Sequence, residues 1–265
     1  MMVRELPEHD LTVFAERRHA HALVIPVINE GERIQRQLAR IRDAAPKVDI
    51  IIADGGSTDG SLDHALLREN GVRALLVKRG PGKLSTQLRM AYAWALDEGY
   101  AGIVTIDGNG KDGVEAIDDF VAALADGYDY VQGSRYVPGG FSENTPLERW
   151  LAGRVIHAPV MSLAGRRRYS DTTNGFRAYS RAYLLDPRVA PFRHAFDRYQ
   201  LLFYLTVRAG QLGYRTKEVP VSRVYPAAGP IPSKIGGFRS KFEHLLELFA
   251  VALGFYHPRS AKAVA

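Results

Sequence analysis

Charged and amide side chains crowd into one short turn near the middle of the chain. The turn reads Asp107-Gly108-Asn109-Gly110-Lys111-Asp112. Oxygen ligands two residues apart, such as those of Asp107 and Asn109, can both face a Mg²⁺ or Mn²⁺ ion that bridges a diphosphate. An ordinary Asn-Gly turn is the plainer interpretation of the same residues. Diphosphate binding is the chemistry that would give this turn a function.

A second polar turn follows an apolar run in the first quarter of the chain. It reads Asp54-Gly55-Gly56-Ser57-Thr58-Asp59-Gly60. The carboxylate of Asp54 could accept hydrogen bonds from a nucleobase or a ribose. A turn-forming and helix-capping role suits the same residues. The residue types alone leave both interpretations open.

A third segment, Gly80-Pro81-Gly82-Lys83, resembles part of a phosphate-binding P-loop. The pattern fails because Leu84 stands where Ser or Thr is required, and Val77 occupies the first glycine position. No G-x-G-x-x-G follows the first apolar run, which argues against a dinucleotide enzyme. Lys83 stays a candidate for a phosphate contact from a helix start, with a solvated helix-end lysine as the alternative.

Arginines in the second half of the chain offer further donors for phosphate groups. Arg135 and Arg177 carry guanidinium forks that match phosphate oxygens. The sequence has no serine–histidine–acid signature, no H-E-x-x-H and no paired-histidine metal spacing. Phosphate chemistry is therefore favoured over hydrolysis by a nucleophilic serine or a histidine-bound metal.

The elements that must position these residues alternate regularly in the first half. Short apolar runs suit strands buried on both faces, and apolar residues at helical spacing suit helices. The expected strands are 22–28, 48–53, 72–77 and 102–106. Helices are expected at 31–44, between the turn that ends at Gly60 and residue 70, and at 84–98. This alternation favours an α/β fold with a mostly parallel sheet and helices on both faces. Asp54 and Asp107 then follow carboxyl ends of strands, where such folds bind ligands.

The second half is less regular. Strands are expected at 128–133 and 214–224, and helices at 147–164, 196–209 and 238–255. The first of these helices should be broken or kinked near Pro159. Since no internal repeat, low-complexity tract or long linker divides the chain, we expect a single domain over residues 1–265.

The composition fits a folded protein with anionic partners. Of the 265 residues, 46% are hydrophobic and 24% are charged, which argues against disorder. A net charge of +6 suggests anionic partners such as nucleotides, phospholipid surfaces or nucleic acid, with a role in solubility as the plainer alternative. The absence of cysteine excludes disulfides and thiolate catalysis and fits a reducing compartment.

Charge and apolarity also bear on location. Residues 1–20 lack the apolar core of a signal peptide, and no stretch reaches the roughly 20 apolar residues that span a bilayer. We therefore expect a cytoplasmic protein. An apolar helix that ends in Arg166-Arg167-Arg168 and the apolar run at 245–256 leave peripheral contact with the inner face of a membrane open. Core packing is the alternative for that helix.

Six segments in order along the chain resemble family 2 glycosyltransferases of the GT-A (Rossmann-like) fold. Among these, the likeness is strongest to the dolichyl- or polyprenyl-phosphate mannosyl and glucosyl transferases. Pro26-Val27-Ile28-Asn29-Glu30 resembles the motif P-x-Y-N-E, residues 52–60 resemble D-D-G-S-x-D-G, and Asp107-Gly108-Asn109 stands at the D-x-D position. Residues 133–136 match G-[ST]-R-Y, residues 170–177 resemble S-D-x-T-x-x-F-R, and residues 233–237 resemble an S-K-L-G loop.

The resemblance implies a role for each matching position. Residues of about 20–135 would form a nucleotide-sugar-binding half, and residues of about 136–265 an acceptor half with a C-terminal helix. The expected donor-binding residues are Pro26, Glu30, Asp54, Lys83, Asp107, Gly108, Asn109 and Lys111. The expected ligands of an acceptor phosphate are Arg135, Arg177 and Lys234. A Mg²⁺ or Mn²⁺ ion would be held by Asp107 and Asn109.

Two departures from the family pattern affect the metal site. Asn109 replaces the second Asp of D-x-D and removes a negative charge. Lys111 stands where the mannosyltransferases often carry another metal ligand, and an ammonium group cannot bind a cation. Either the metal binds more weakly here, or Lys111 itself neutralises the diphosphate.

The expected reaction is sugar transfer with inversion, by in-line attack of an acceptor oxygen on the anomeric carbon. The donor would be a nucleotide-sugar, with UDP favoured over GDP, and the acceptor a polyprenyl phosphate or another glycoconjugate precursor. The catalytic candidates are Asp107, Asp171, Arg135 and Arg177. A hydroxyl acceptor would need a general base, for which Asp171 is the best candidate. A phosphate acceptor is already an anion and would leave Asp171 to orient Arg177 or the metal.

Two other classes stay open on the sequence. Asn109 and Lys111 suggest a nucleotide-sugar-binding protein that has lost catalysis. A nucleotidyltransferase can share a similar sheet and aspartate sites, but it would release pyrophosphate from a nucleoside triphosphate. Nucleic acid is not an expected partner, and the sequence does not indicate an oligomeric state.

Overall fold

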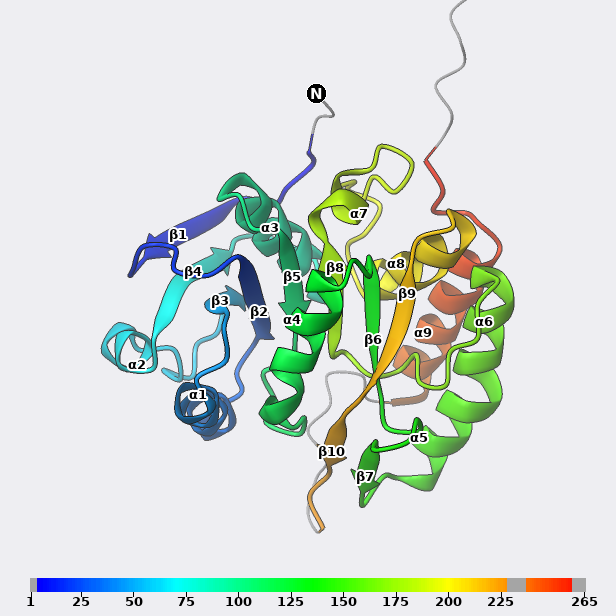
Figure 1. Cartoon of the computed structure of the whole chain (residues 1–265), viewed down its shortest axis with the longest axis horizontal. Helices are drawn as coiled ribbons and strands as arrows, with labels where there is room; N and C mark the ends of the chain where they lie inside the picture. The colour runs from blue at the N-terminus through cyan, green and yellow to red at the C-terminus, as the bar shows by residue number, and fades with distance from the viewer. Residues whose placement is uncertain (1–3, 228–236, 259–265) are drawn as a thin grey trace, which may run out of the picture.

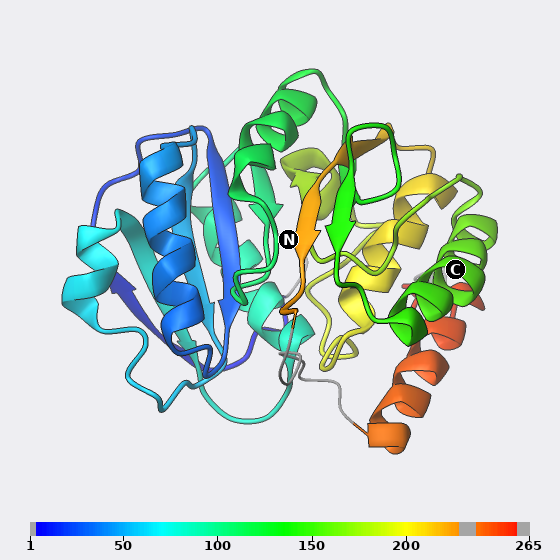
Figure 2. The ribbon, with the colours of Figure 1, turned by 90° about the horizontal axis from the view of Figure 1, so that it is seen from below.

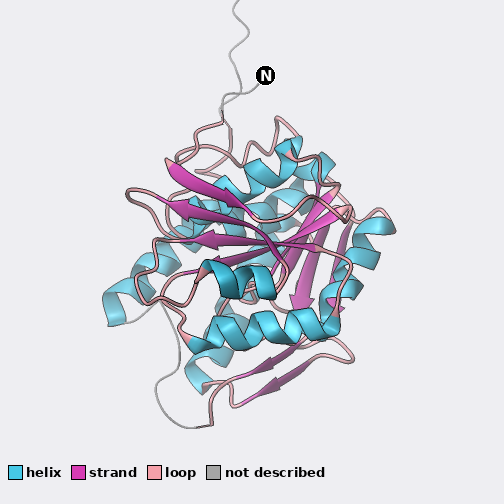
Figure 3. Cartoon of the chain, turned by 90° about the vertical axis from the view of Figure 1, so that its left-hand side faces the viewer, coloured by secondary structure: helices cyan, strands magenta, loops and turns pink. Residues whose placement is uncertain are grey.

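An eight-stranded sheet runs through the computed structural model, which describes residues 4–227 and 237–258 (Figure 1). Its strand order is β1-β4-β3-β2-β5-β8-β6-β9, and β7 and β10 form a small second sheet. The strands are β1 (His9–Val13), β2 (His21–Val27), β3 (Asp49–Asp54), β4 (Val72–Lys78), β5 (Gly102–Thr105), β6 (Tyr130–Ser134), β7 (Phe141–Glu143), β8 (Arg177–Ser180), β9 (Thr216–Pro220) and β10 (Ser222–Val224). Figure 3 shows the two-stranded sheet apart from the main one.

Helices cover both faces of the main sheet. Helices α1 (Glu32–Ala44), α2 (His64–Glu69) and α4 (Ile117–Ala125), with the short 3₁₀ turn η1 (Val114–Ala116), pack on one face. On the other face lie α3 (Leu84–Asp97), α6 (Ala158–Gly165), α7 (Arg181–Leu185), α8 (Gln200–Gln211) and α9 (Gly237–Ala252). Before α6 come α5 (Leu147–Leu151) and the π-helix η2 (Ala152–His157). In Figure 2, α9 (orange to red) lies beside α8 (yellow).

The interior positions of the central strands β2, β3 and β5 are apolar because both faces of the sheet are buried there. Val24 and Ile51 belong to the core under α3, whereas their neighbours Leu23 and Ile52 belong to the core under α1. Successive side chains of a strand point to opposite faces, so continuous apolar runs mark strands covered on both sides. The α/β fold with helices on both faces is thus confirmed.

The sheet is parallel at its centre and mixed elsewhere. Four of its seven neighbouring strand pairs are parallel, including the run β4-β3-β2-β5 predicted from the alternating pattern. Strand β1 adds an antiparallel edge, and β8 enters between β5 and β6, antiparallel to both. Since β8 comes from the second half, one sheet joins both halves of the chain. The division into a donor half and an acceptor half stays a prediction.

Several boundaries in the second half differ from those expected. The strand expected at 214–224 splits into β9 and β10, which pair with different sheets. The helix expected from residue 196 begins at Gln200, and the C-terminal helix ends at Ala252. The irregularity expected near Pro159 is the π-helix at 152–157, just before it. Proline lacks the N–H that would close the preceding helical turn, so the chain widens there.

Core and edge leucines provide a test of this architecture. Leu38 of α1 is fully buried against the sheet, whereas Leu11 of edge strand β1 is 45% exposed. We predict that Leu38→Ala lowers the free energy of unfolding by about 2–5 kcal/mol, because it removes core contacts and leaves a cavity. The matched Leu11→Ala should cost less than about 1 kcal/mol. Urea denaturation followed by circular dichroism measures both free energies of unfolding. Equal decreases in the two variants would contradict the burial of Leu38 and the exposure of Leu11.

Candidate active site

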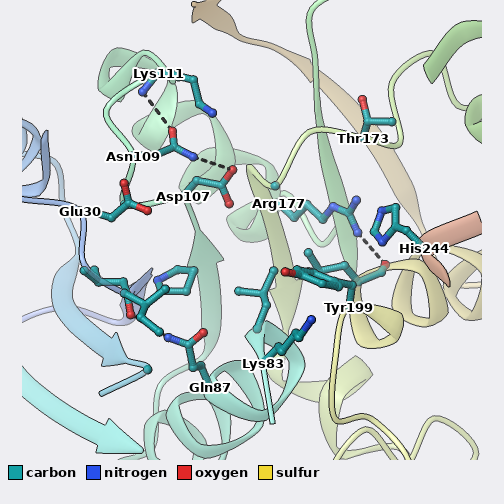
Figure 4. Close-up of a pocket in the computed structure, with 18 of the residues that line it drawn as sticks. Glu30, Lys83, Gln87, Asp107, Asn109, Lys111, Thr173, Arg177, Tyr199 and His244 are labelled. Atoms are coloured by element: carbon teal, nitrogen blue, oxygen red, sulfur yellow. Dashed lines mark hydrogen bonds between the residues drawn. The ribbon is translucent and has the colours of Figure 1, made fainter. Parts of the chain in front are cut away.

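A cavity of about 460 Å³ opens at the carboxyl edge of the parallel strands. Figure 4 shows side chains from both halves of the chain converging on it. Pro26 and Gly108 line it at the strand ends, Thr173 lines it from the segment before β8, and Arg177 lines it from the first position of β8. Helices α5, η2 and α9 reach it through Arg149, His157 and His244, respectively. The cavity therefore lies where sequence reasoning placed a ligand site.

The turn after β5 is held at both of its ends by one glutamine. The Nε2 of Gln37 donates to the carbonyl of Asp107 at 2.9 Å, and its Oε1 accepts from the N–H of Gly110 at 2.8 Å. Gln37 is buried on the face of α1 that packs against the sheet. Sequence reasoning missed it, although a polar residue at a core position of a helix signals a specific partner. This clamp fixes the backbone of the turn that carries Asp107.

Two glycines allow the close approaches around Asp107. A Cβ atom on Gly175 would lie 2.4 Å from the Oδ1 of Asp107, so the carboxylate rests directly against that backbone. A Cβ on Gly108 would lie 2.9 Å from the carbonyl oxygen of Pro26. The segment before β8 and the end of β2 thus both pack against the turn at van der Waals distance.

Behind Asp107 lies a buried ion pair that the sequence did not reveal. The Nη1 of Arg223 in β10 donates to both carboxylate oxygens of Asp112, at 2.7 and 2.6 Å. Its Nη2 lies 3.3 Å from the Oδ2 of Asp107. Burial alone would lower the pKa of Arg223, but the charges of Asp112 and Asp107 outweigh it and raise the pKa, so the guanidinium stays charged. Arg223 also lines the cavity.

Three cations gather around the ring of Tyr225. The Nζ of Lys111 lies 5.3 Å from the ring centroid, and the guanidinium carbons of Arg223 and Arg149 lie at 5.6 and 5.8 Å. Burial and the nearby Arg223 lower the pKa of Lys111 to about 8, against the opposing pull of Asp107 and Asp112. All three cations line the cavity, so this wall is suited to an anion.

The oxygens expected to hold a metal ion fit that role poorly. The Oδ2 of Asp107 faces the Nδ2 of Asn109 at 3.4 Å as well as Arg223, and the Oδ1 of Asn109 accepts from the N–H of Lys111 at 3.3 Å. Within residues 4–227 and 237–258, no group of three or more His, Asp or Glu side chains could hold a metal ion. One carboxylate with two neighbouring cations is a weak donor set for Mg²⁺ or Mn²⁺.

Asp171, the residue expected as a general base for a hydroxyl acceptor, lies in a buried ion pair. Its carboxylate accepts from the Nε and Nη2 of Arg135 at 2.6 and 2.9 Å, and both side chains are buried. Burial raises the pKa of Asp171, but the hydrogen bonds and charge of Arg135 outweigh it, so the pKa lies below its ordinary value. Neither side chain is among those lining the cavity. Asp171 and Arg135 thus form a buried ion pair, and Arg135 also donates to the hydroxyl of Thr173 at 2.8 Å. The catalytic role of Asp171 and the phosphate role of Arg135 stay predictions.

Arg177 also differs from its expected role. Although it lines the cavity, its guanidinium donates to the carbonyls of Thr172, Asn174 and Leu202 and to the hydroxyl of Thr206. A group whose N–H donors are committed to buried carbonyls has little left for a phosphate. Arg177 therefore braces the segment at 172–177 against α8, and it is not oriented by Asp171.

The remaining expected residues are placed as follows. Pro26 and Glu30 line the cavity, and Glu30 accepts from Arg33 at 2.8 Å. Lys83 begins α3 at the cavity, with its Nζ 5.8 Å from the ring centroid of Tyr199. The carboxylate of Asp54 caps its own turn by accepting from Ser57, as the alternative interpretation had it. Lys234 lies outside the described residues.

A second buried glutamine closes the strand edge on the other side of the cavity. The Nε2 of Gln87 in α3 donates to the carbonyls of Val27 and Ala53 at 2.8 and 3.0 Å, and so bridges the ends of β2 and β3. Sequence reasoning missed this residue too. Beyond it, the far end of the cavity is lined by aromatic and imidazole rings, namely His157, Tyr199, Phe203 and His244. Burial lowers the pKa of His157 to about 4, so that end carries a neutral imidazole at neutral pH.

Comparison with known proteins connects this geometry to an enzyme family. Residues 22–193 match the model of glycosyl transferase family 2. The chain is 30% identical over 205 residues to a polyprenol monophosphomannose synthase of Mycolicibacterium smegmatis, covering 76% of each chain. It is 31% identical over 223 residues to an undecaprenyl-phosphate mannosyltransferase of Micrococcus luteus, covering 81% of this chain and 86% of the relative.

The fold has a similar solved structure. Glucosyl-3-phosphoglycerate synthase of Mycobacterium tuberculosis, solved with Mn²⁺, UDP and phosphoglyceric acid, superposes with a TM-score of 0.65 at 15% identity, covering 91% of this chain and 80% of that one. This likeness confirms the expected GT-A fold. Together with the family match over more than half of its length, it shows that the chain is a glycosyltransferase and belongs to glycosyl transferase family 2.

Proposed function

We propose that this enzyme transfers a sugar from a nucleoside diphosphate sugar to a polyprenyl phosphate at a membrane surface, with inversion at the anomeric carbon. The observation that carries the proposal is the two-ended cavity. Its cationic wall at Lys111 and Arg223 suits a diphosphate, and its lining residues Arg149, His157 and His244 belong to helices that expose apolar side chains. The names of the two relatives, both transferases of mannose to lipid phosphates, support the same acceptor class.

Donor binding is assigned to the edge formed by β2 and the turn after β5. Pro26, Glu30, Asp107 and Asn109 all line the cavity. Figure 4 shows Glu30 beside Asp107 and Asn109. The family relationship and the cationic wall support a nucleotide-sugar in this place. The proposal includes the preference expected from the sequence, namely that the nucleotide of the donor is UDP rather than GDP. The divalent metal seen in the mycobacterial synthase belongs to that protein, and the donor set described above gives it weak support here.

The chemistry needs little from the protein beyond position and charge. An oxygen of the acceptor phosphate attacks the anomeric carbon while the bond from that carbon to the diphosphate breaks, and the bonding electron pair leaves with the nucleoside diphosphate. Because the acceptor is already an anion, no general base has to remove a proton. Fixed cations close to the leaving oxygen stabilise the charge that develops there. Arg223 and Lys111 are the cations placed for this task.

The acceptor side of the cavity is built from helices with an exposed apolar surface. Met161 of the helix 147–165 is buried in the core, but several of its neighbours face outward. The exposed apolar residues on α5, η2, α6, α9 and the turn that follows are Leu147, Trp150, Leu151, Val155, Leu163, Phe242, Leu246, Phe249, Leu253 and Phe255. No helix in the described part of the chain is long and apolar enough to cross a bilayer. An apolar helical surface with adjacent arginines fits peripheral contact with an anionic membrane, at its cytoplasmic face.

The main test of the proposal is a donor and acceptor screen. Purified protein with extracted polyprenyl phosphate should release nucleoside diphosphate from one sugar donor, and should give a lipid-linked sugar on thin-layer chromatography. Omitting the lipid should reduce release to slow hydrolysis, because the attacking oxygen is missing. Absence of transfer with every donor would contradict the proposal, and pyrophosphate release from a nucleoside triphosphate would point to a nucleotidyltransferase.

The role of Asp171 can be separated from catalysis. We predict that Asp171→Asn lowers the free energy of unfolding by about 3–5 kcal/mol, because Arg135 is left buried without its partner. The double variant Arg135→Gln/Asp171→Asn should be less destabilised, since it removes both charges. Turnover of the folded fraction should change only a few-fold, whereas loss of a general base costs roughly a hundredfold or more.

The same pair sets a pH dependence of stability. Folding lowers the pKa of Asp171, which is paired with Arg135. The pair therefore contributes fully to the free energy of unfolding above the ordinary aspartate pKa of about 4, and this contribution is lost as the pH falls through the lowered pKa. Wild type should therefore lose its stability advantage over the double variant in acid. If the difference in unfolding free energy between wild type and the double variant did not change with pH, the ion pair would not be the source of this stability.

Membrane contact predicts a specific pattern of flotation with liposomes. Leu163 and Leu253 are 83% and 73% exposed on α6 and just after α9. Replacing both with Ser should reduce the fraction bound to anionic vesicles by roughly tenfold or more, because each buried leucine contributes about 1.5–3 kcal/mol. The matched control Leu11→Ser/Val13→Ser, on the exposed edge strand β1, should float like wild type. If both double variants lost vesicle binding equally, the helices that carry Leu163 and Leu253 would not be the surface that contacts the membrane.

A further inference from the structure

The counter-charge that a sugar diphosphate requires is already present in this cavity as side chains. Lys111, Arg149 and Arg223 converge on the ring of Tyr225, and each of them lines the cavity. The carboxylates facing this cluster are Asp107 and Asp112. Among the described residues of this cluster, the three cations outnumber the two carboxylates. The wall is therefore electrostatically complementary to an anion and repels a further cation.

Arg223 is held in place much as a bound ion would be. Both oxygens of the fully buried Asp112 accept hydrogen bonds from its Nη1, and the backbones of the two residues are bridged as well. The stacking of its guanidinium near Tyr225 adds a second constraint. Its Nη2 stays next to Asp107, within 3.3 Å of that carboxylate. A cation fixed in this way needs no reorganisation when an anion arrives.

The position of Arg223 also conflicts with a divalent ion at the same carboxylate. Asp107 is the carboxylate of the turn that faces the cavity, because both oxygens of Asp112 are committed to Arg223. The Oδ1 of Asn109 is directed to the N–H of Lys111 within the turn, as Figure 4 shows. A metal ion bound at Asp107 would stand beside a guanidinium and close to an ammonium group, and would meet their repulsion.

We propose that Arg223, with Lys111 and supported by Asp112 and Tyr225, binds the diphosphate of the donor and takes the place of a divalent metal ion. This inference rests on the proposed function, since it assumes a nucleoside diphosphate sugar as donor. The enzyme then binds nucleoside diphosphates in the absence of metal. Arg149, on α5, closes the same wall from the acceptor side.

The first test measures nucleotide binding with and without metal. Isothermal titration of UDP and of GDP into the metal-stripped full chain should give dissociation constants that differ by less than about threefold between EDTA and Mn²⁺. Uridine and guanosine, which lack phosphates, should bind far more weakly than the nucleotide. Binding that is lost in EDTA and restored by Mn²⁺ would overturn the inference while the proposed function stands. Absence of nucleotide binding under both conditions would overturn both.

The second test assigns the counter-charge to Arg223. Arg223→Gln/Asp112→Asn removes the buried pair together, so that no unpaired carboxylate is left in the interior, and it should weaken UDP or GDP binding by about ten- to a hundredfold. Arg36→Gln/Glu32→Gln removes an exposed ion pair on α1 and serves as the matched control, with unchanged affinity expected. Thermal melting confirms that both variants are folded. Equal affinity of folded Arg223→Gln/Asp112→Asn and wild type would contradict the assignment.

A third variant converts the site in the opposite direction. Asn109→Asp/Lys111→Gln adds a carboxylate two residues from Asp107 and removes one cation. Nucleotide binding by this variant should depend on Mn²⁺, and electron paramagnetic resonance should detect protein-bound Mn²⁺ in the variant but not in wild type. Tight Mn²⁺ binding by the wild-type chain without nucleotide would contradict the inference.

Discussion

The ion pair between Asp112 and Arg223 joins parts of the chain that the main sheet would leave apart. Asp112 follows β5, whereas Arg223 lies in β10, in the small second sheet. Because a buried charge without its partner is costly, each residue fixes the position of the other. The pair holds β10 and Tyr225 next to the turn at Asp107. These residues close the cavity on its cationic side. Without this link the cavity would lack the wall that distinguishes it from a generic strand-edge crevice.

Neutral clamps complete what this charged link begins. Gln37 holds the turn after β5, and Gln87 ties β2 to β3, each with hydrogen bonds to backbone groups. Backbone groups at strand ends have lost their ladder partners, and buried amides satisfy them without adding charge. A site whose donors are already oriented avoids reorganisation during the reaction, which is the main source of electrostatic catalysis.

How far the sequence predicts this structure depends on where the partners of each residue lie. The strands β2 to β5 were predicted because continuous apolar runs in the sequence indicate buried strands. Strand β8 was not predicted, since its place between β5 and β6 depends on contacts far along the chain. Asp107 was located by the strand that precedes it, but the contacts of Asp171 and Arg177 could not be predicted, because a motif does not show which groups are already committed to hydrogen bonds. Arg223 was missed because its partner lies 111 residues earlier.

The reaction proposed here brings two anions into one cavity, and the distribution of charge along its walls reflects that constraint. The end near α8 and α9 holds His157 and His244, and burial lowers the pKa of each to about 4, so that neither adds charge at neutral pH. That end is lined mainly by aromatic and imidazole rings, with the Nζ of Lys83 at 5.8 Å from the centroid of the Tyr199 ring. It suits the apolar part of a lipid, next to the helices that expose apolar side chains. The cations stand at the opposite end, around Tyr225. Arg149 comes from α5, one of the helices of the acceptor side, and reaches the same ring, so an acceptor phosphate and a donor diphosphate could share this wall. Two anions that repel each other in water can then approach within bonding distance, because the charge between them is supplied by the protein.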